Sequence, residues 1–356
     1  MNTNTGTQTL EWLYTHQLKV DEEWSQQTAN GFRWWADKNA QAIEAIGQET
    51  ASDGEVADYI CVRTEMLRSV VLNDNALEII NDQLMSVASM GGPVYDPKTR
   101  TLSLCSLVRV YADIRPWMQN LISSASVLQI GEAREQGPRL ALALDAELAI
   151  SGHAENGIRP EPDELASIIQ QLVIPMGVSP CSWNAEDFLG IGKKYLNRPP
   201  SLMGNADSSG FIVEFPYGNQ SSLCQVLGNQ PHPLYGNGLL QLQRFPLPEL
   251  NHIDGIKLAL IMNENELTRK PLGYGFGSYA YRNGILYFNS FTPNMCAAQL
   301  SLENMYFSCG QRAREISKRF TGNDWSEETF SPGKSALGRM MDSEQLVTEL
   351  IGNWSC

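Results

Sequence analysis

The chain has 356 residues, of which 42% are hydrophobic and 19% are charged, and its formal net charge is −14. This length predicts two domains rather than one, with enough apolar residues for two cores. The acidity argues against a nucleic-acid-binding protein, which needs a basic patch, and against adsorption to anionic membranes.

The N-terminal region and the cysteines predict a cytoplasmic protein. Residues 1–30 are polar and of mixed charge, so no signal peptide is expected. The longest apolar stretches, such as residues 140–150, contain Asp145 and Glu147 and are too short to span a bilayer. The seven cysteines form no CxxC pair and several lie in apolar runs, which indicates reduced core thiols in a reducing compartment.

The first half of the chain predicts a helix, three strands, a second helix, a hairpin and a closing helix. Turn residues 37–39 separate the first two strands, and Pro116 suits the first turn of the closing helix, where its missing N–H is not needed. The expected elements are a helix at 9–26, strands at 32–36, 40–48 and 59–63, a helix at 72–81, strands at 84–94 and 101–111, and a helix from Pro116 up to Gly137, where a connector is expected to begin.

The second half predicts the same order. Asn283-Gly284 is a strong hairpin signal, and residues 239–245 alternate apolar with polar side chains as a half-buried strand does. The expected elements are a helix at 185–196, strands at 211–215 and 222–227, a loop at 228–238, a strand at 239–245, a helix at 252–267, strands at 274–281 and 285–291, and a helix at 297–320. Asp163 is expected to cap a short helix up to residue 173, and Asp342 another at 343–351.

A shift of about 180 residues relates the two halves, which indicates a duplication. Gly31-Phe32-Arg33-Trp34-Trp35 opens one unit and residues 210–215 open the other, while Ala133-Arg134-Glu135 returns as Ala313-Arg314-Glu315. We therefore expect an α+β protein made of two tandem copies of an α-β-β-β-α-β-β-α domain with antiparallel sheets, each followed by an extra helix. The expected domains are residues 1–150, a helical connector at 151–184, and residues 185–356.

This order of elements resembles that of the type III secretion chaperone and YbjN-like superfamily. The resemblance covers residues 31–136 and 210–320, and it is clearer in the second copy, where Ile261-Met262-Asn263-Glu264-Asn265 ends a helix before a glycine-containing strand and an aromatic strand. It implies a protein-binding domain rather than an enzyme. Chaperones of this type dimerise and hold extended effector segments on their surface, so a tandem pair on one chain would imitate the dimer internally.

Motifs of catalysis are not recognisable. The four histidines form no metal-binding spacing, and Gly273-Tyr274-Gly275-Phe276-Gly277 lacks the Lys-Ser/Thr of a phosphate-binding loop. The GxSxG motif of hydrolases is absent. The paired carboxylates are adjacent or nearly adjacent in sequence, which is typical of solvent-exposed charged residues rather than of a catalytic acid and base. We therefore expect no catalytic, cofactor-binding or metal-binding residues.

Aromatic strand residues are the candidates for a protein-binding surface. Trp34 and Trp35 lie on opposite faces of one strand, so one ring either contacts a partner or is covered by an added helix. The second copy carries a similar aromatic hairpin, for which the same alternatives hold. Its members are Tyr279, Tyr281, Tyr287 and Phe288.

Two hypotheses for function follow. The first is a non-catalytic, chaperone-like or adaptor protein that binds a polypeptide of unknown identity, either as a monomeric internal pseudo-dimer or as a homodimer. The alternative is an enzyme or small-ligand binder with its site in the cleft between the halves, with clustered titratable residues involving Asp163, Glu164 or Arg198. The duplication also has a purely structural interpretation, in which the two sheets pack as one pseudo-symmetric body.

Overall fold

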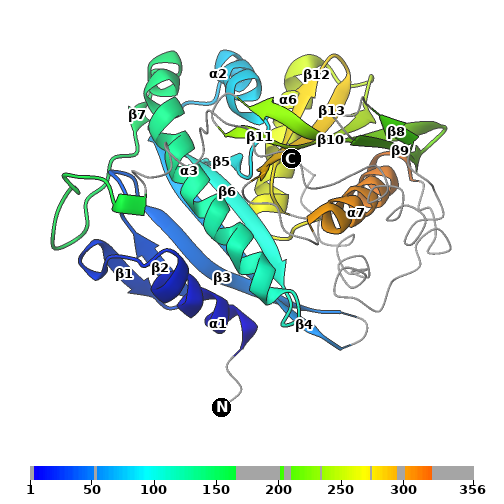
Figure 1. The fold of residues 1–356 in the computed structure, drawn as a ribbon. Coiled ribbons are helices and arrows are strands. Elements are labelled where there is room, and N and C mark those ends of the chain that lie inside the picture. Colours follow the sequence, from blue (N-terminus) through cyan, green and yellow to red (C-terminus); the bar gives the residue numbers. More distant parts are fainter. Residues whose placement is uncertain are drawn as a thin grey trace.

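A computed structural model of the chain describes residues 4–51, 54–165, 201–203, 210–232, 235–272, 275–294 and 301–322. The expected helices at 185–196 and 343–351 and nearly all of the one beginning at Asp163 lie outside these residues, as do Cys181, Cys296 and Cys356. The described chain forms two antiparallel sheets with helices packed on them, which makes it an α+β protein (Figure 1).

The first sheet has the strand order β1-β2-β3-β4-β6-β5, with the short β7 paired to the end of β4. Its elements are α1 (Thr5–Trp12), β1 (Ser25–Thr28), β2 (Gly31–Trp34), β3 (Gln41–Thr50), β4 (Val56–Arg68), α2 (Asp74–Ile80), β5 (Gly92–Asp96), β6 (Thr101–Val110), α3 (Arg115–Ala143) and β7 (Glu147–Leu148). α3 packs against β4 and β6 and covers one face of this sheet (Figure 1).

The second sheet has the order β8-β9-β10-β11-β13-β12, so its strands follow the chain in the same pattern as β1 to β6. Its elements are β8 (Ser201–Met203), β9 (Gly210–Tyr217), β10 (Gln220–His232), β11 (Gly236–Pro246), α6 (His252–Thr268), β12 (Ser278–Arg282), β13 (Ile285–Pro293) and α7 (Ser301–Thr321). α7 packs against β9 and β11. One continuous cluster of buried apolar side chains runs through both halves.

Several expected boundaries are wrong. Each sheet has four strands before its middle helix rather than three, because the short edge strands β1 and β8 carry no apolar alternation that would reveal them. The helix expected at 9–26 is α1 extended by a π-helical turn at Leu13–Gln17, and residues 25–28 are strand. A second π-helical turn, Asn81–Met85, replaces the start of the strand expected at 84–94. The loop expected at 228–238 is largely strand.

The closing helix of the first half is longer than expected. α3 begins with Pro116 in its first turn, as predicted, but it continues through Gly137 and the exposed Pro138 to Ala143. A helix can tolerate an interior proline, at the loss of one backbone hydrogen bond, when packing holds the turns on both sides. The residues after it, including 149–163, pack back on the first half, so the boundary expected at residue 150 falls within a docked segment.

Candidate functional site

The two sheets meet through backbone hydrogen bonds exchanged in both directions. The amide of Leu107 in β6 donates to the carbonyl of Gly275, and the amide of Phe291 in β13 donates to the carbonyl of Ser89, each at 3.2 Å. β6 and β13 hold corresponding places in the two sheets, and Ser89 and Gly275 precede the corresponding edge strands β5 and β12. Each half thus contacts the other through the same part of its fold, as in an interface with two-fold symmetry.

Glycines allow this close approach. Gly275 has a φ of +76°, and a Cβ there would lie 1.6 Å from the carbonyl oxygen of Leu107. A Cβ on Gly92, at the start of β5, would lie 2.7 Å from the carbonyl oxygen of Gly277. Gly275 therefore belongs to the contact between the sheets.

Two asparagine side chains complete the hydrogen bonds of β12, the edge strand of the second sheet. Asn81, from the first half, accepts from the amide of Tyr281 at 2.9 Å and donates to its carbonyl at 3.0 Å. Asn263, from α6, does the same for Tyr279, at 2.6 and 3.1 Å. Both asparagine side chains are fully buried. Each side-chain amide therefore makes, for one residue of β12, the pair of hydrogen bonds that a neighbouring strand would otherwise make.

Replacing Asn81 by alanine should destabilise the junction. The change leaves the amide and carbonyl of Tyr281 buried without their partner, which we expect to lower the free energy of unfolding by about 2–3 kcal/mol in urea denaturation. Asn75→Ala, at an exposed position of α2, is the matched control and should change it by less than about 0.5 kcal/mol. Equal effects of the two substitutions would contradict a structural role for the Asn81 amide.

A buried charge cluster spans the junction. Glu49 of β3 accepts from the fully buried Arg109 of β6 at 2.7 Å and from the Tyr59 hydroxyl at 2.5 Å, and Lys270, just after α6, approaches it at 3.5 Å. Burial alone would raise the pKa of Glu49, but the Arg109 and Lys270 cations and the tyrosine hydrogen bond outweigh it and hold that pKa below its ordinary value. Glu49 is therefore an ionised carboxylate that binds the end of α6 to the first sheet.

A second buried carboxyl at the junction has no cation among its described partners. Glu132 of α3 accepts hydrogen bonds from the hydroxyls of Ser89 and Tyr235, the latter from the second half. Burial raises the pKa of Glu132 to about 7, although the two hydroxyl hydrogen bonds oppose that rise. The imidazole of His232 stacks on Tyr235 with ring centroids 4.4 Å apart, and burial lowers its pKa to about 4.

The titratable residues at the junction are thus different from those the sequence suggested. The described contacts of Asp163 are with the first half: its carboxylate lies 3.3 Å from Arg159, and its amide donates to the carbonyl of Ala36. Glu164 is exposed, and Arg198 lies outside the described residues. No sequence motif points to Glu132, because its partners Ser89 and Tyr235 are far from it in the chain.

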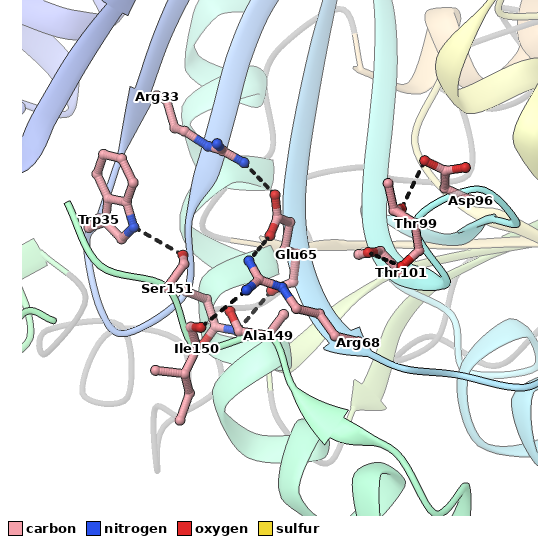
Figure 2. A network of polar contacts seen from close by, with 11 residues as sticks. Arg33, Trp35, Glu65, Arg68, Asp96, Thr99, Thr101, Ala149, Ile150 and Ser151 are labelled. Atoms are coloured by element: carbon pink, nitrogen blue, oxygen red, sulfur yellow. Dashed lines mark hydrogen bonds and ion pairs between the residues drawn. The ribbon is translucent and has the colours of Figure 1, made fainter. Parts of the chain in front are cut away.

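The expected surface at Trp34 and Trp35 is not present, because both side chains are buried. The Trp34 indole donates to Gln41 in the core of the first half at 2.9 Å. The Trp35 indole donates to the Ser151 hydroxyl at 3.1 Å (Figure 2). The ring of His153 packs edge-on against the Trp35 ring. Trp35 is therefore covered by an added segment, and that segment is the chain after β7 rather than a helix.

The aromatic hairpin of the second half is also largely interior, which corrects the same expectation there. Tyr279, Tyr281 and Phe288 are at most 1% exposed, because α6, α7 and the first half pack on them. Tyr287 is half-buried and lies across from Arg244 of β11. Of the six residues, Tyr287 alone keeps an exposed portion.

Two open grooves lie away from the junction. The first, which we call the α1 groove, has a volume of about 680 Å³ and lies between α1 (Thr7, Glu11), Tyr14 of the π-helical turn after it, the β1–β2 turn and residues 45–48 of β3. The second, the α6–α7 groove, has a volume of about 870 Å³ and lies between the β9–β10 turn, residues 246–250, α6 and the end of α7.

The α1 groove contains a free strand edge. β2 pairs with β3 only as far as Glu44, and Ala45 donates to the carbonyl of Asn30, so no described strand pairs with this side of β3 from Ile46 onward. The ladder with β4 shifts register between Ala45 and Gly47, and this bulge leaves Ile46 unpaired and 40% exposed in the groove. Bulges commonly re-aim a side chain in this way at functional sites.

Within the described residues, no group of three or more His, Cys, Asp and Glu side chains is placed to hold a metal ion. No helix there is long and apolar enough to cross a membrane. Cys61, Cys105, Cys224 and Cys309 are buried free thiols, as predicted.

Comparisons of the chain with protein-family models, with curated proteins and with solved structures found no match.

Proposed function

We propose that the chain is a non-catalytic, cytoplasmic protein that binds an extended polypeptide, and that it is a tandem duplication of a unit resembling the type III secretion chaperone and YbjN-like superfamily. The identical strand order of the two sheets supports the duplication. The exchanged hydrogen bonds from Leu107 and Phe291 support an internal pseudo-dimer, because reciprocal contacts are the mark of a two-fold interface.

The observation that carries the binding function is the free edge of β3 in the α1 groove. A strand edge offers a row of backbone donors and acceptors to which an extended peptide can add, and flanking side chains then select its sequence. Here the edge is bordered by α1 on one side and by Ile46 at the bulge, so the groove offers both backbone pairing and an apolar contact. Glu11 at the groove would favour a peptide with basic residues.

A peptide-selection experiment tests this function. Extended peptides selected from a displayed random library on the full chain should lose at least about tenfold in affinity for Ile46→Asp, because a carboxylate would be desolvated against the bound peptide. Val56→Asp is the matched control, since Val56 is an equally exposed aliphatic strand residue (42%) outside the groove. Binding that is insensitive to Ile46→Asp, or equally weakened by Val56→Asp, would refute the assignment.

A further inference from the structure

In the first half, the chain that leaves the closing helix docks on the end of the sheet. After α3, β7 pairs with Leu67 and Arg68 of β4, and the amide of Ala149 donates to the carbonyl of Met66. Figure 2 shows that Ile150 and Ser151, which follow Ala149, lie between Trp35 and Arg68. The Arg68 guanidinium donates to the carbonyl of Ile150 at 3.4 Å.

The same segment covers the β2–β3 turn. Ile150 forms a bridge with Asn39, and the amide of Ser151 donates to the carbonyl of Lys38 at 2.9 Å. The amide of Asp163 donates to the carbonyl of Ala36 at 2.7 Å. The docking surface therefore consists of the β2–β3 turn and the last residues of β4.

The corresponding surface of the second half can be identified from strand register. Trp34 pairs with Gln41 in the first half, and Phe215 pairs with Ser222 in the second, so the two hairpins can be aligned at these equally spaced pairs, although β9 and β10 continue pairing to Tyr217 and Gln220. Counted from these pairs, residues 36–39 correspond to 217–220, and residues 65–68 correspond to 246–249. Residues 217–220 and 246–250 line the α6–α7 groove, together with residues of α6 and α7.

The groove is open where the first half is covered. Its walls are largely apolar: Ile261 is 40% exposed, Leu247, Leu250 and Phe320 are partly exposed, and the buried Tyr217 also lines the groove. The carbonyl of Leu247, which corresponds to that of Met66, already accepts from the Tyr281 hydroxyl and the Leu250 amide. The site is therefore suited to apolar side chains rather than to a paired strand.

We propose that the α6–α7 groove is the docking site of the chain that follows α7, residues 323–356, with Trp325 and Phe330 as its apolar anchors. Thr321, the last residue of α7, lines the groove, and Gly322 leaves the helix with a φ of +68°. Glu147 is the fourth residue after the end of α3, and Trp325 is the fourth after the end of α7. A segment tethered at the groove also has a high effective concentration there.

This inference rests on the duplication in the proposed function, but its test uses a different groove from the peptide experiment. A photoreactive benzoylphenylalanine in place of Ile261 in the full chain should cross-link, on irradiation, to a peptide of the same chain that contains Trp325 or Phe330. The double substitution Trp325→Ala/Phe330→Ala should reduce that cross-link at least about fivefold, because it removes both large apolar contacts. The same photoreactive residue at Leu142, exposed at 87% and outside the groove, is the control.

Mass spectrometry of the cross-linked peptides separates the outcomes. A cross-link to another segment of the chain, to a second copy, or no cross-link above that of the Leu142 control would overturn the docking. A cross-link that survives the double substitution unchanged would overturn the assignment of the anchors. If the cross-link fails while Ile46→Asp still abolishes peptide binding, the docking is wrong and the proposed function stands.

Discussion

Replacing Glu266 by leucine is expected to lower the free energy of unfolding by about 3–5 kcal/mol, the largest effect of any single substitution proposed for this chain. Glu266 of α6 and Arg312 of α7 form an ion pair at 2.5 Å, and their side chains are 1% and 0% exposed. Removing the carboxylate leaves the guanidinium charged in the core of the second half without its partner, which is far more costly than the loss of the pair itself.

Arg312 cannot avoid this cost by losing its proton, because a guanidinium stays protonated in proteins. In the unsubstituted chain burial disfavours its charge, and the Glu266 carboxylate outweighs burial and raises the pKa of Arg312 above its already high ordinary value. The guanidinium also lies 3.4 Å over the ring of Phe288 and donates to the Tyr279 hydroxyl at 3.2 Å. It is held on several sides, so it has no exposed position to move to.

A double substitution and a surface control make this prediction specific. Glu266→Leu/Arg312→Met should recover most of the lost stability, because two apolar side chains replace two charges. Glu264→Leu removes a partly exposed carboxylate on the same helix that pairs with Arg269 at 2.6 Å, and it should change stability by less than about 1 kcal/mol. Urea denaturation of the four proteins measures these values. A double variant as unstable as Glu266→Leu would contradict the role of the unpaired charge.

Stability should also depend on pH through Glu132, at the junction. Its pKa is raised to about 7 in the folded protein, so between the ordinary glutamate value and pH 7 the folded state holds a proton that the unfolded state has released. The contribution of this carboxyl to stability is complete below about pH 4 and is lost as the pH rises to about 7. The difference between the two pKa values corresponds to about 3 kcal/mol.

Glu132→Gln isolates this effect, because an amide has the same shape but does not titrate. We expect the stability of Glu132→Gln, relative to the unsubstituted chain, to rise by about 3 kcal/mol between pH 4.5 and pH 7.5 in urea denaturation. His232 has the opposite effect, because burial lowers its pKa to about 4: the folded protein loses stability as the pH falls from about 6.5 towards 4. This loss is the same in the unsubstituted chain and in Glu132→Gln. Comparing the two curves therefore removes the histidine contribution.

Glu135→Gln is the matched control for the pH experiment. Glu135 is exposed on the same helix, so its substitution should leave the pH profile parallel to that of the unsubstituted chain. A Glu132→Gln profile that is also parallel would show that the Glu132 carboxyl titrates normally. In that case the Glu132 carboxyl would not be buried in solution, because burial is what raises its pKa.

Local features of the fold were predictable where one or two residues control the backbone. Asn283-Gly284 predicted a hairpin, and the structure joins β12 to β13 there with both residues at positive φ. Pro116 predicted the start of the closing helix of the first half. The π-helical turn at Asn81–Met85, whose first residue contacts β12 of the other half, was missed because no local pattern in the sequence indicates it.

The candidate sites were much less predictable. The pattern predicted large rings at Trp34 and Trp35, but β2 ends at Trp34, and whether the Trp35 ring is exposed depends on Ser151 and His153, which return to it after more than a hundred residues. The free edge of β3 depends on how far β2 and α1 extend, and sequence patterns predict the ends of helices and strands poorly.

By itself the sequence determined the α+β class and most of the strands and helices, because periodicity and turn chemistry act over a few residues. Tertiary structure alone decided which aromatic faces are covered, which carboxyls meet at the junction, and which grooves stay open. Those outcomes depend on segments far apart in the chain packing together, and the free energy of burying a charge or a ring is set only once they have met.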